Sequence, residues 1–303
     1  MKSVYLITGA AGGLGKAFAV ECAARGWDLF LTDLDEASLR LLAGALERTY
    51  GVEVAVHASD LTNSASRSAL FDTFRSEGRR FRGLINVAGL DHEGLFMERR
   101  GEEILAILRL NIESTLITIH TLLGFRDHAV TFRIINVSSL AAFFSMPVKA
   151  TYAASKRFLL DFSLALRNEL RDENVTVTVL CPAGMPTNDA CIAGIEAQGI
   201  LGQLTTADIG RVAYETIEAA QRGQAIVIPV VLNRLVRWVG GLIPAASVAE
   251  LIGARWRAAR QRRSDRTADL NCLPHEIVSP GPGPFPCRWS APPWSRRKSG
   301  SAR

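Results

Sequence analysis

A tyrosine and a lysine stand four positions apart in TYAASK (151–156), with only small residues between them. In a helix this spacing places Tyr152 and Lys156 on one face. A tyrosine has a reference pKa near 10, so the phenol is a poor base at neutral pH unless a positive charge stabilises its phenolate. Lowering that pKa by roughly three units takes about 4 kcal/mol. The pair predicts a proton-transferring tyrosine; the alternative is two ordinary helix residues.

The segment TGAAGGLG (8–15) is a candidate phosphate-binding turn. It follows the apolar run VYLITG (4–9) and precedes a helical pattern that starts at Gly15. Glycines let the backbone turn tightly and approach a pyrophosphate, and the helix N-terminus adds free N–H groups. The alternative is a glycine-rich turn that binds no ligand.

Asp33 ends the next apolar run, 18 residues after Gly15. A carboxylate at this place can accept hydrogen bonds from both ribose hydroxyls of NAD, and it repels the 2′-phosphate of NADP. The residue that follows is Leu34, so no arginine stands ready for that phosphate. Asp33 therefore predicts a preference for NAD, unless it is only an exposed turn aspartate.

Short apolar runs alternate with amphipathic stretches along the chain. We expect strands and helices respectively, and so an α/β fold: a doubly wound (Rossmann) parallel sheet with helices on both faces. Runs that are apolar at both odd and even positions are typical of strands buried on both sides. The expected strands are 4–9, 28–33, 52–60, 83–89, 132–139, 175–182 and 225–230, and the expected helices are 15–25, 36–50, 64–77, 101–123 and 152–171.

The carboxyl ends of these expected strands carry small or polar residues. Asp60 and Leu61 end the third strand, where an adenine edge would lie, and NVAG (86–89) ends the fourth. Ligands of open α/β sheets bind at this edge.

With these motifs in order, residues 3–230 resemble the classical short-chain dehydrogenase/reductase family. The family's patterns TGxxxGxG, NNAG, YxxxK and PGxxxT read here TGAAGGLG, NVAG, YAASK and PAGMPT, so Val87 and Ala183 are departures, as is Ala142 after the serine. Gly9, Gly12 and Gly15 also fit the loop of the extended branch, but the other motifs favour the classical one. The matching positions are Thr8, Gly9, Gly13, Gly15, Asn86, Ala88, Gly89, Asn111, Ser139, Tyr152, Lys156, Pro182 and Thr187.

The resemblance implies a role for each of these side chains. Tyr152 would be the acid/base toward the substrate oxygen, Ser139 would hold that oxygen, Lys156 would also bind the nicotinamide ribose, and Asn111 would help to hold a relay water. The alternatives are that Ser139 only caps the end of a strand and that Asn111 is an ordinary asparagine inside a helix. The implied cofactor-binding residues are Thr8, Gly9, Gly13, Leu14, Gly15, Asp33, Asp60, Leu61, Asn86, Ala88, Gly89, Tyr152, Lys156, Pro182 and Thr187.

The function we expect is an NAD(P)-dependent oxidoreductase that moves a hydride between nicotinamide and an alcohol or ketone. The alternatives are a dinucleotide-binding regulator without turnover and a lipid-surface protein of the same fold. An intact set of Asn111, Ser139, Tyr152 and Lys156 favours the enzyme. Substrate choice is expected to lie in a lid at 184–209 and in LDHEGLFM (90–97).

The C-terminal residues differ in charge and composition from the rest. The net charge of the chain is +5. Residues 232–263 hold seven arginines and one glutamate (+6) and residues 264–303 hold six basic and three acidic groups (+3), so residues 1–231 carry −4, which argues against nucleic-acid binding. We expect a catalytic domain at 1–231, a basic amphipathic helical extension at 232–263 and a disordered proline-rich tail at 264–303. The extension would pack on the core or on another subunit of a homo-oligomer, or lie on an anionic membrane, which would favour an apolar substrate.

The remaining composition indicates a cytoplasmic protein without a metal site. The five cysteines are scattered and the five histidines show no ligand spacing. No charge-free apolar run is long enough for an ordinary transmembrane helix, and the start MKSVYLITGA indicates a strand rather than a signal peptide.

Overall fold

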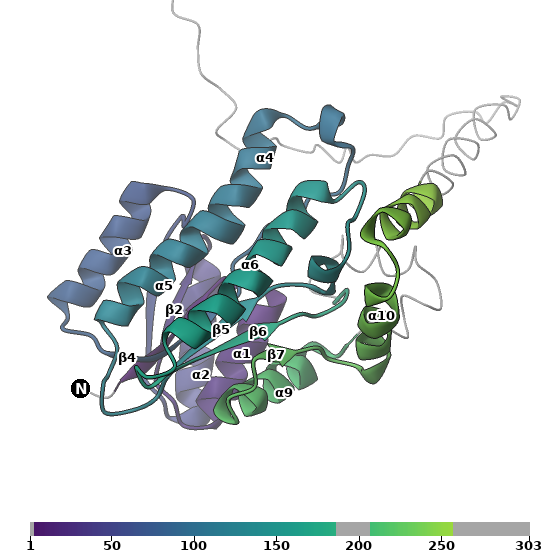
Figure 1. The fold of residues 1–303 in the computed structure, drawn as a ribbon. Coiled ribbons are helices and arrows are strands. Elements are labelled where there is room, and N and C mark those ends of the chain that lie inside the picture. The colour runs from purple at the N-terminus through teal and green to yellow at the C-terminus, as the bar shows by residue number, and fades with distance from the viewer. Residues whose placement is uncertain (1–2, 186–206, 257–303) are drawn as a thin grey trace, which may run out of the picture. The chain divides into compact units, whose positions relative to one another are not determined.

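Residues 3–185 and 207–256 are described by the computed structural model. Within them, seven parallel strands form one sheet in the order β3-β2-β1-β4-β5-β6-β7 (Figure 1). The strand order reverses direction between β1 and β4, and this reversal is where open α/β sheets bind ligands at the carboxyl edge. The strands are β1 Val4–Thr8, β2 Leu29–Asp33, β3 Val54–Ala58, β4 Phe81–Asn86, β5 Phe132–Val137, β6 Val175–Leu180 and β7 Ile226–Val227.

Helices cover both faces of the sheet (Figure 1). One face packs against α1, α2 and α9, and the other packs against α3, α5 and α6. The predicted doubly wound α/β fold is confirmed. The helices are α1 Gly13–Ala24, α2 Glu36–Tyr50, α3 Ser64–Ser76, α4 Gly101–Leu108, α5 Ser114–Gly124, α6 Ala150–Glu169, α9 Ile209–Gln221 and α10 Val231–Gly241, with short turns at Phe96–Glu98 (η1), Arg109–Glu113 (η2) and Leu140–Phe143 (η3).

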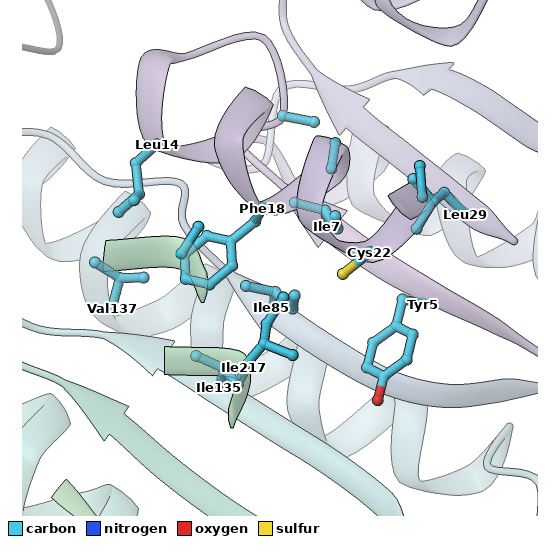
Figure 2. Packing of buried hydrophobic residues seen from close by; sticks show 14 of the residues in the cluster. Tyr5, Ile7, Leu14, Phe18, Cys22, Leu29, Ile85, Ile135, Val137 and Ile217 are labelled. Carbon is cyan, nitrogen blue, oxygen red and sulfur yellow. The ribbon is translucent and has the colours of Figure 1, made fainter. Parts of the chain in front are cut away.

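The alternation of side chains along β1 explains how one strand serves two cores. Tyr5 and Ile7 point to the α1 side, where they meet Phe18 and Cys22 (Figure 2). Val4 and Leu6 point to the opposite side and join a separate cluster under α3 and α5. Because every residue of β1 is buried, the run had to be apolar at both parities.

Several boundaries differ from the sequence predictions. The third strand ends at Ala58 rather than at residue 60, so Asp60 and Leu61 lie in the turn after it. The predicted helix 101–123 is interrupted by a π-helical turn, Arg109–Glu113. The predicted strand 225–230 pairs only over Ile226–Val227, and α9, which directly follows the predicted lid at 184–209, was not predicted.

The chain divides into two compact units, Met1–Ala259 and Arg260–Arg303, and every described residue lies in the first. The predicted tail 264–303 and most of the predicted lid lie outside the described residues. Past the sheet, α10 is followed by a second helix over 245–256.

The helix α10 touches the rest of the unit through a narrow strip. Asn233 is fully buried and donates from Nδ2 to the carbonyl oxygen of Pro229 at 3.2 Å. A Cβ on Gly240 would overlap the ring of Phe144, so that ring would have to move if the glycine were replaced. Most of the helix's large apolar side chains are left exposed: Val231, Leu235, Val236, Trp238 and Val239.

One helical stretch, Gly101–Gly124, is long and apolar enough to cross a membrane by length and hydropathy alone. It consists of α4, η2 and α5, and α5 packs Ile119 and Leu122 into the sheet's core. A core helix of a globular domain passes the same length and hydropathy test, and the packing of α5 is of that kind.

Candidate active site

The glycine turn between β1 and α1 depends on its glycines at two positions. Gly9 has φ +66°, and a Cβ there would lie 2.7 Å from the backbone nitrogen of Ala88. A Cβ on Gly15 would overlap the carbonyl oxygen of Gly9. Larger residues would therefore push the start of α1 away from the turn and from the segment after β4.

The N-terminus of α1 is open to an anion. Its N-cap is Gly12, which offers no side-chain acceptor to the first-turn N–H groups, and the first turn, which includes Gly13, Leu14 and Gly15, carries no acidic residue. The free N–H groups and the helix dipole together favour a phosphate at such an end. This cradle fits the pyrophosphate of a dinucleotide.

Asp33 is fixed beside this cradle. Its Oδ2 accepts a hydrogen bond from the backbone N–H of Ala11 at 3.0 Å, and its Oδ1 accepts one from Leu34 at 2.7 Å. Leu34 itself is 71% exposed. The carboxylate thus both braces the glycine turn and stands at its edge without a basic neighbour in the chain.

The segment NVAG after β4 is tied to β1. The hydroxyl of Thr8 accepts hydrogen bonds from the backbone N–H groups of Val87 and Ala88, at 3.2 and 3.3 Å. Asp60, in the turn after β3, accepts from the N–H and hydroxyl of Thr62, and Leu61 is buried. These residues line up along the carboxyl edges of β1, β4 and β3.

A buried amide network crosses the sheet below the site. Asn86 in β4 lies in register with Asn136 in β5 and donates to its Oδ1 at 2.9 Å, and Asn136 donates onward to the hydroxyl of Ser163 at 2.9 Å. The sequence analysis missed Asn136 and Ser163. The available signal was the repeat of Ile-Asn-Val in LINVAG and IINVSS, which puts an asparagine at the same level of two strands.

Asn111 sits fully buried in the π-helical turn between α4 and α5. Its Oδ1 accepts from the N–H of Leu90 at 2.8 Å, and its Nδ2 donates to the carbonyl of Leu90 and the hydroxyl of Ser155, each at 3.0 Å. The carboxamide therefore holds the start of the 90–97 segment. Such π turns occur often at functional sites because the extra residue re-aims the backbone.

Lys156 is buried in the same place, with 4% of its surface exposed. Its ammonium group donates to the carbonyl oxygen of Val137 at 3.0 Å. Burial lowers the pKa of Lys156 to about 8, and the negative charge of Asp91 opposes that effect. A Cβ on Gly89 would lie 3.2 Å from the Lys156 ammonium and 3.3 Å from Oδ1 of Asn111, so this glycine makes room for both groups.

Tyr152 is half-buried one helical turn before Lys156, on the same face of α6. The Lys156 nitrogen lies 5.7 Å from the centre of its ring. Ser139 lies two residues after the end of β5, and its hydroxyl accepts from the N–H of Ala141 at 3.1 Å, so it caps the short helix η3. The cap matches the structural alternative for Ser139. Because the hydroxyl oxygen only accepts in this bond, its hydrogen remains free to donate.

The end of β6 closes this edge. Pro182 is buried, and its carbonyl accepts from the N–H of Leu140 at 2.7 Å. Thr187 lies outside the described residues. The ion pair of Lys149, which lies beside Tyr152, with Asp91 was missed because the two residues are 58 positions apart in the sequence.

The described residues contain no group of three or more His, Cys, Asp or Glu side chains that could hold a metal. A cavity of about 550 Å³ lies between α9, β7 and α10, lined by residues such as Tyr214, Arg222 and Arg234. None of the predicted site residues lines it.

The family model for short chain dehydrogenases matches residues 3–190, which include the glycine turn, Asn111, Ser139, Tyr152 and Lys156. The chain belongs to the short-chain dehydrogenase/reductase family. Its match to the classical type, with a Rossmann nucleotide-binding fold, confirms the resemblance seen in the sequence.

Among similar proteins, a very-long-chain 3-oxoacyl-CoA reductase of Laccaria bicolor is 35% identical over 57% of this chain and 52% of its own length. A diacetyl reductase of Staphylococcus epidermidis is 31% identical over 60% of this chain and 71% of its own. This short-chain dehydrogenase thus spans about half the length of the very-long-chain relative that it matches.

A short-chain dehydrogenase from Sphingobium yanoikuyae, solved in complex with NADPH, has the same fold. Its TM-score is 0.67 with 24% identity, over 92% of this chain and 99% of that one.

Proposed function

We propose that this short-chain dehydrogenase is an NAD(P)-dependent oxidoreductase acting on an alcohol or ketone, with Tyr152 as the acid/base. The observation that carries the proposal is the buried Lys156 ammonium, fixed on the Val137 carbonyl and 5.7 Å from the Tyr152 ring. A bound nicotinamide supplies the hydride acceptor or donor. The residues of the chain supply position, charge and the proton.

Each proposed role follows from a contact. Lys156 stabilises the phenolate of Tyr152 because a cation one turn away favours the charged form. The free hydroxyl hydrogen of Ser139 donates to the substrate oxygen. Asn111 acts by holding Leu90, at the start of the segment that faces the substrate, and its part in a proton relay stays a prediction.

We propose NAD as the preferred cofactor. The support is Asp33, whose carboxylate is held at the edge of the glycine turn, with an exposed Leu34 and no arginine after it. A 2′-phosphate placed there would meet the negative charge of Asp33, and the residue that follows offers it no basic partner. The NADPH complex of the Sphingobium protein describes that protein, which is 24% identical to this chain.

We propose an apolar substrate. Three residues at the end of the 90–97 segment, Leu95, Phe96 and Met97, are 42%, 60% and 91% exposed, although all three are large and apolar. They follow the stretch that Asn111 holds, in the segment where we expect substrate choice to lie. The match to a very-long-chain 3-oxoacyl-CoA reductase supports the same substrate class.

A substrate series tests this proposal. Purified protein would be assayed with alcohols and ketones of increasing chain length, including a 3-oxoacyl thioester, with NAD(H) and NADP(H) in parallel. We expect kcat/KM to rise with chain length. Tight dinucleotide binding with no turnover of any compound would instead support the regulator, the second candidate of this fold.

We further propose that the extension 232–263, next to a catalytic domain at 1–231, makes peripheral contact with an anionic membrane from the cytoplasm. Trp238 is 67% exposed and Leu242 is 69% exposed, and tryptophan suits the boundary between apolar and wet surroundings. The arginines that follow, from Arg255 to Arg263, add the positive charge that anionic lipids attract.

Vesicle co-sedimentation at low salt tests the membrane contact. Full-length protein should bind phosphatidylglycerol vesicles, and Trp238→Ser with Leu242→Ser should weaken binding, as should deletion of 232–303. Leu41→Ser is the matched control, because Leu41 is a leucine that is 77% exposed on α2 and is not part of the extension. Absence of binding by the full-length protein would contradict the proposal, and a dimer lost in the Trp238 variant would show instead that this face meets a second copy.

A further inference from the structure

Tyr152 lies beside two ammonium groups. The nitrogen of Lys149, three residues before it, is 5.7 Å from the centre of its ring, the same distance as that of Lys156. Lys156 approaches from inside the protein, whereas Lys149 is 21% exposed at the start of α6. The family pattern YxxxK accounts for Lys156 and says nothing of Lys149.

Lys149 is held in this place by the segment after β4. Its ammonium forms ion pairs with Asp91 at 2.6 Å and Glu93 at 3.7 Å. The neighbouring backbone is joined as well, since the N–H of Gly94 donates to the carbonyl of Val148 at 2.8 Å. Val148 adopts a φ of +72°, which is costly for a β-branched residue and shows how firmly this junction is set.

The same segment is anchored at its other end. Asn111 holds both the N–H and the carbonyl of Leu90, one residue before Asp91. Asp91 is therefore fixed between a buried carboxamide and the Lys149 ammonium. Its charge also reaches Lys156, where it opposes the lowering of the pKa by burial.

We propose that Lys149 is a second positioning cation for Tyr152, and that Asp91 sets how much of its charge the phenol feels. The inference rests on the proposed role of Tyr152 and deepens it. Lys149 and Asp91 touch no reacting atom, so they act through Tyr152.

The charges near Tyr152 predict in which direction each substitution should shift the pKa of Tyr152. Lys149, Lys156, Asp91 and Glu93 are the charged groups whose contacts connect them to the Tyr152 ring or to Lys149. The helix α6 also carries Arg157, Asp161, Arg167 and Glu169, and the segment after β4 also carries His92, Glu98, Arg99 and Arg100. Arg99 donates to the carbonyl of Glu93, and burial raises the pKa of Cys181, near Lys156, to about 12, so that thiol is neutral. Removing the Lys149 charge leaves two carboxylates unbalanced, whereas removing the Asp91 charge leaves Lys149 less neutralised.

The two variants should therefore shift the titration of Tyr152 in opposite directions. Lys149→Met should raise the pKa of Tyr152, and Asp91→Asn should lower it, each by about half a pH unit to one unit for a charge at this distance near a wet surface. If the Lys149–Asp91 contact only stabilised the fold, the two variants would not shift the pKa of Tyr152 in opposite directions. Lys149→Arg keeps the charge and the ion pair, so the pKa of Tyr152 in this variant should stay close to its value in the unmodified protein.

The experiment is an NMR titration of protein labelled at tyrosine Cζ. The chain has four tyrosines, so the Tyr152 signal can be assigned by its loss in Tyr152→Phe. Asp161→Asn is the matched control, because it breaks an ion pair with Arg157 that is exposed on the same helix. The acid limb of the pH profile for alcohol oxidation should move with the Tyr152 pKa in each variant.

Opposite shifts in Lys149→Met and Asp91→Asn support the proposal. Shifts in the same direction, or none in either variant, overturn it. The titration reads the ring directly, so it also separates two failures: turnover by Tyr152→Phe would refute the acid/base role alone, whatever Lys149 does to the phenol.

Discussion

The ammonium group of Lys156 donates a 3.0 Å hydrogen bond to the carbonyl oxygen of Val137, at the very end of β5. The bond ties the helix that carries Tyr152 to the strand that leads into Ser139. It also leaves a buried cation next to a half-buried phenol.

We predict that Lys156 loses its proton near pH 8, because burial lowers its pKa from 10.5 to about that value. The cation is present below this pKa and is lost as the pH rises through it, so kcat/KM should fall above about pH 8. Lysine Cε NMR can follow the titration, since the chain has five lysines and Lys156→Met identifies the signal. A Lys156 signal that titrates near 10.5 would be incompatible with this account.

We predict that Gly89→Ala impairs turnover. The new methyl group would lie 3.2 Å from the Lys156 ammonium and 3.3 Å from Oδ1 of Asn111, so one of the two must move. We expect a loss of about tenfold in kcat, since that corresponds to about 1.4 kcal/mol of barrier. Gly124→Ala, where a Cβ would meet no atom within 4 Å, is the control and should keep full activity.

We predict that the charge of Asp33, rather than its brace on the glycine turn, sets cofactor preference. Asp33→Asn can still accept from the N–H of Ala11 but no longer repels a phosphate, so it should narrow the preference for NAD. Asp33→Ala with Leu34→Arg should narrow it further or reverse it. The measurement is kcat/KM for NAD and NADP, and equal values in the unmodified protein would refute the preference.

We predict that Asn136→Ala destabilises the fold. It leaves the buried Nδ2 of Asn86 and the hydroxyl of Ser163 without the partner they share, and an unsatisfied buried polar group costs about 1–3 kcal/mol. Denaturant unfolding should show a loss of that size. Asn168→Ala, at an exposed position near the end of α6, should change the free energy of unfolding by less than about 0.5 kcal/mol. Similar values for the two variants would show that the network adds no stability.

Much of the fold could be predicted because local patterns determine it. A strand such as β1, buried at every residue, must be apolar at both parities, and the glycines of 8–15 show where the backbone passes close to another segment. The π turn at Asn111 was not predicted because one extra residue barely alters a helical period. Lys149 was not singled out because its partners, Asp91 and Glu93, are distant in sequence and meet it only in the folded chain.

The most direct test of the account is the turnover of Tyr152→Phe, measured beside its affinity for NADH. The change keeps the ring and removes only the hydroxyl, so we expect NADH binding close to that of the unmodified protein and no measurable turnover, while Lys156→Met should damage both. If Tyr152→Phe kept more than about a tenth of kcat, only about 1.4 kcal/mol of barrier would depend on the phenol, and Tyr152 would not be the acid/base.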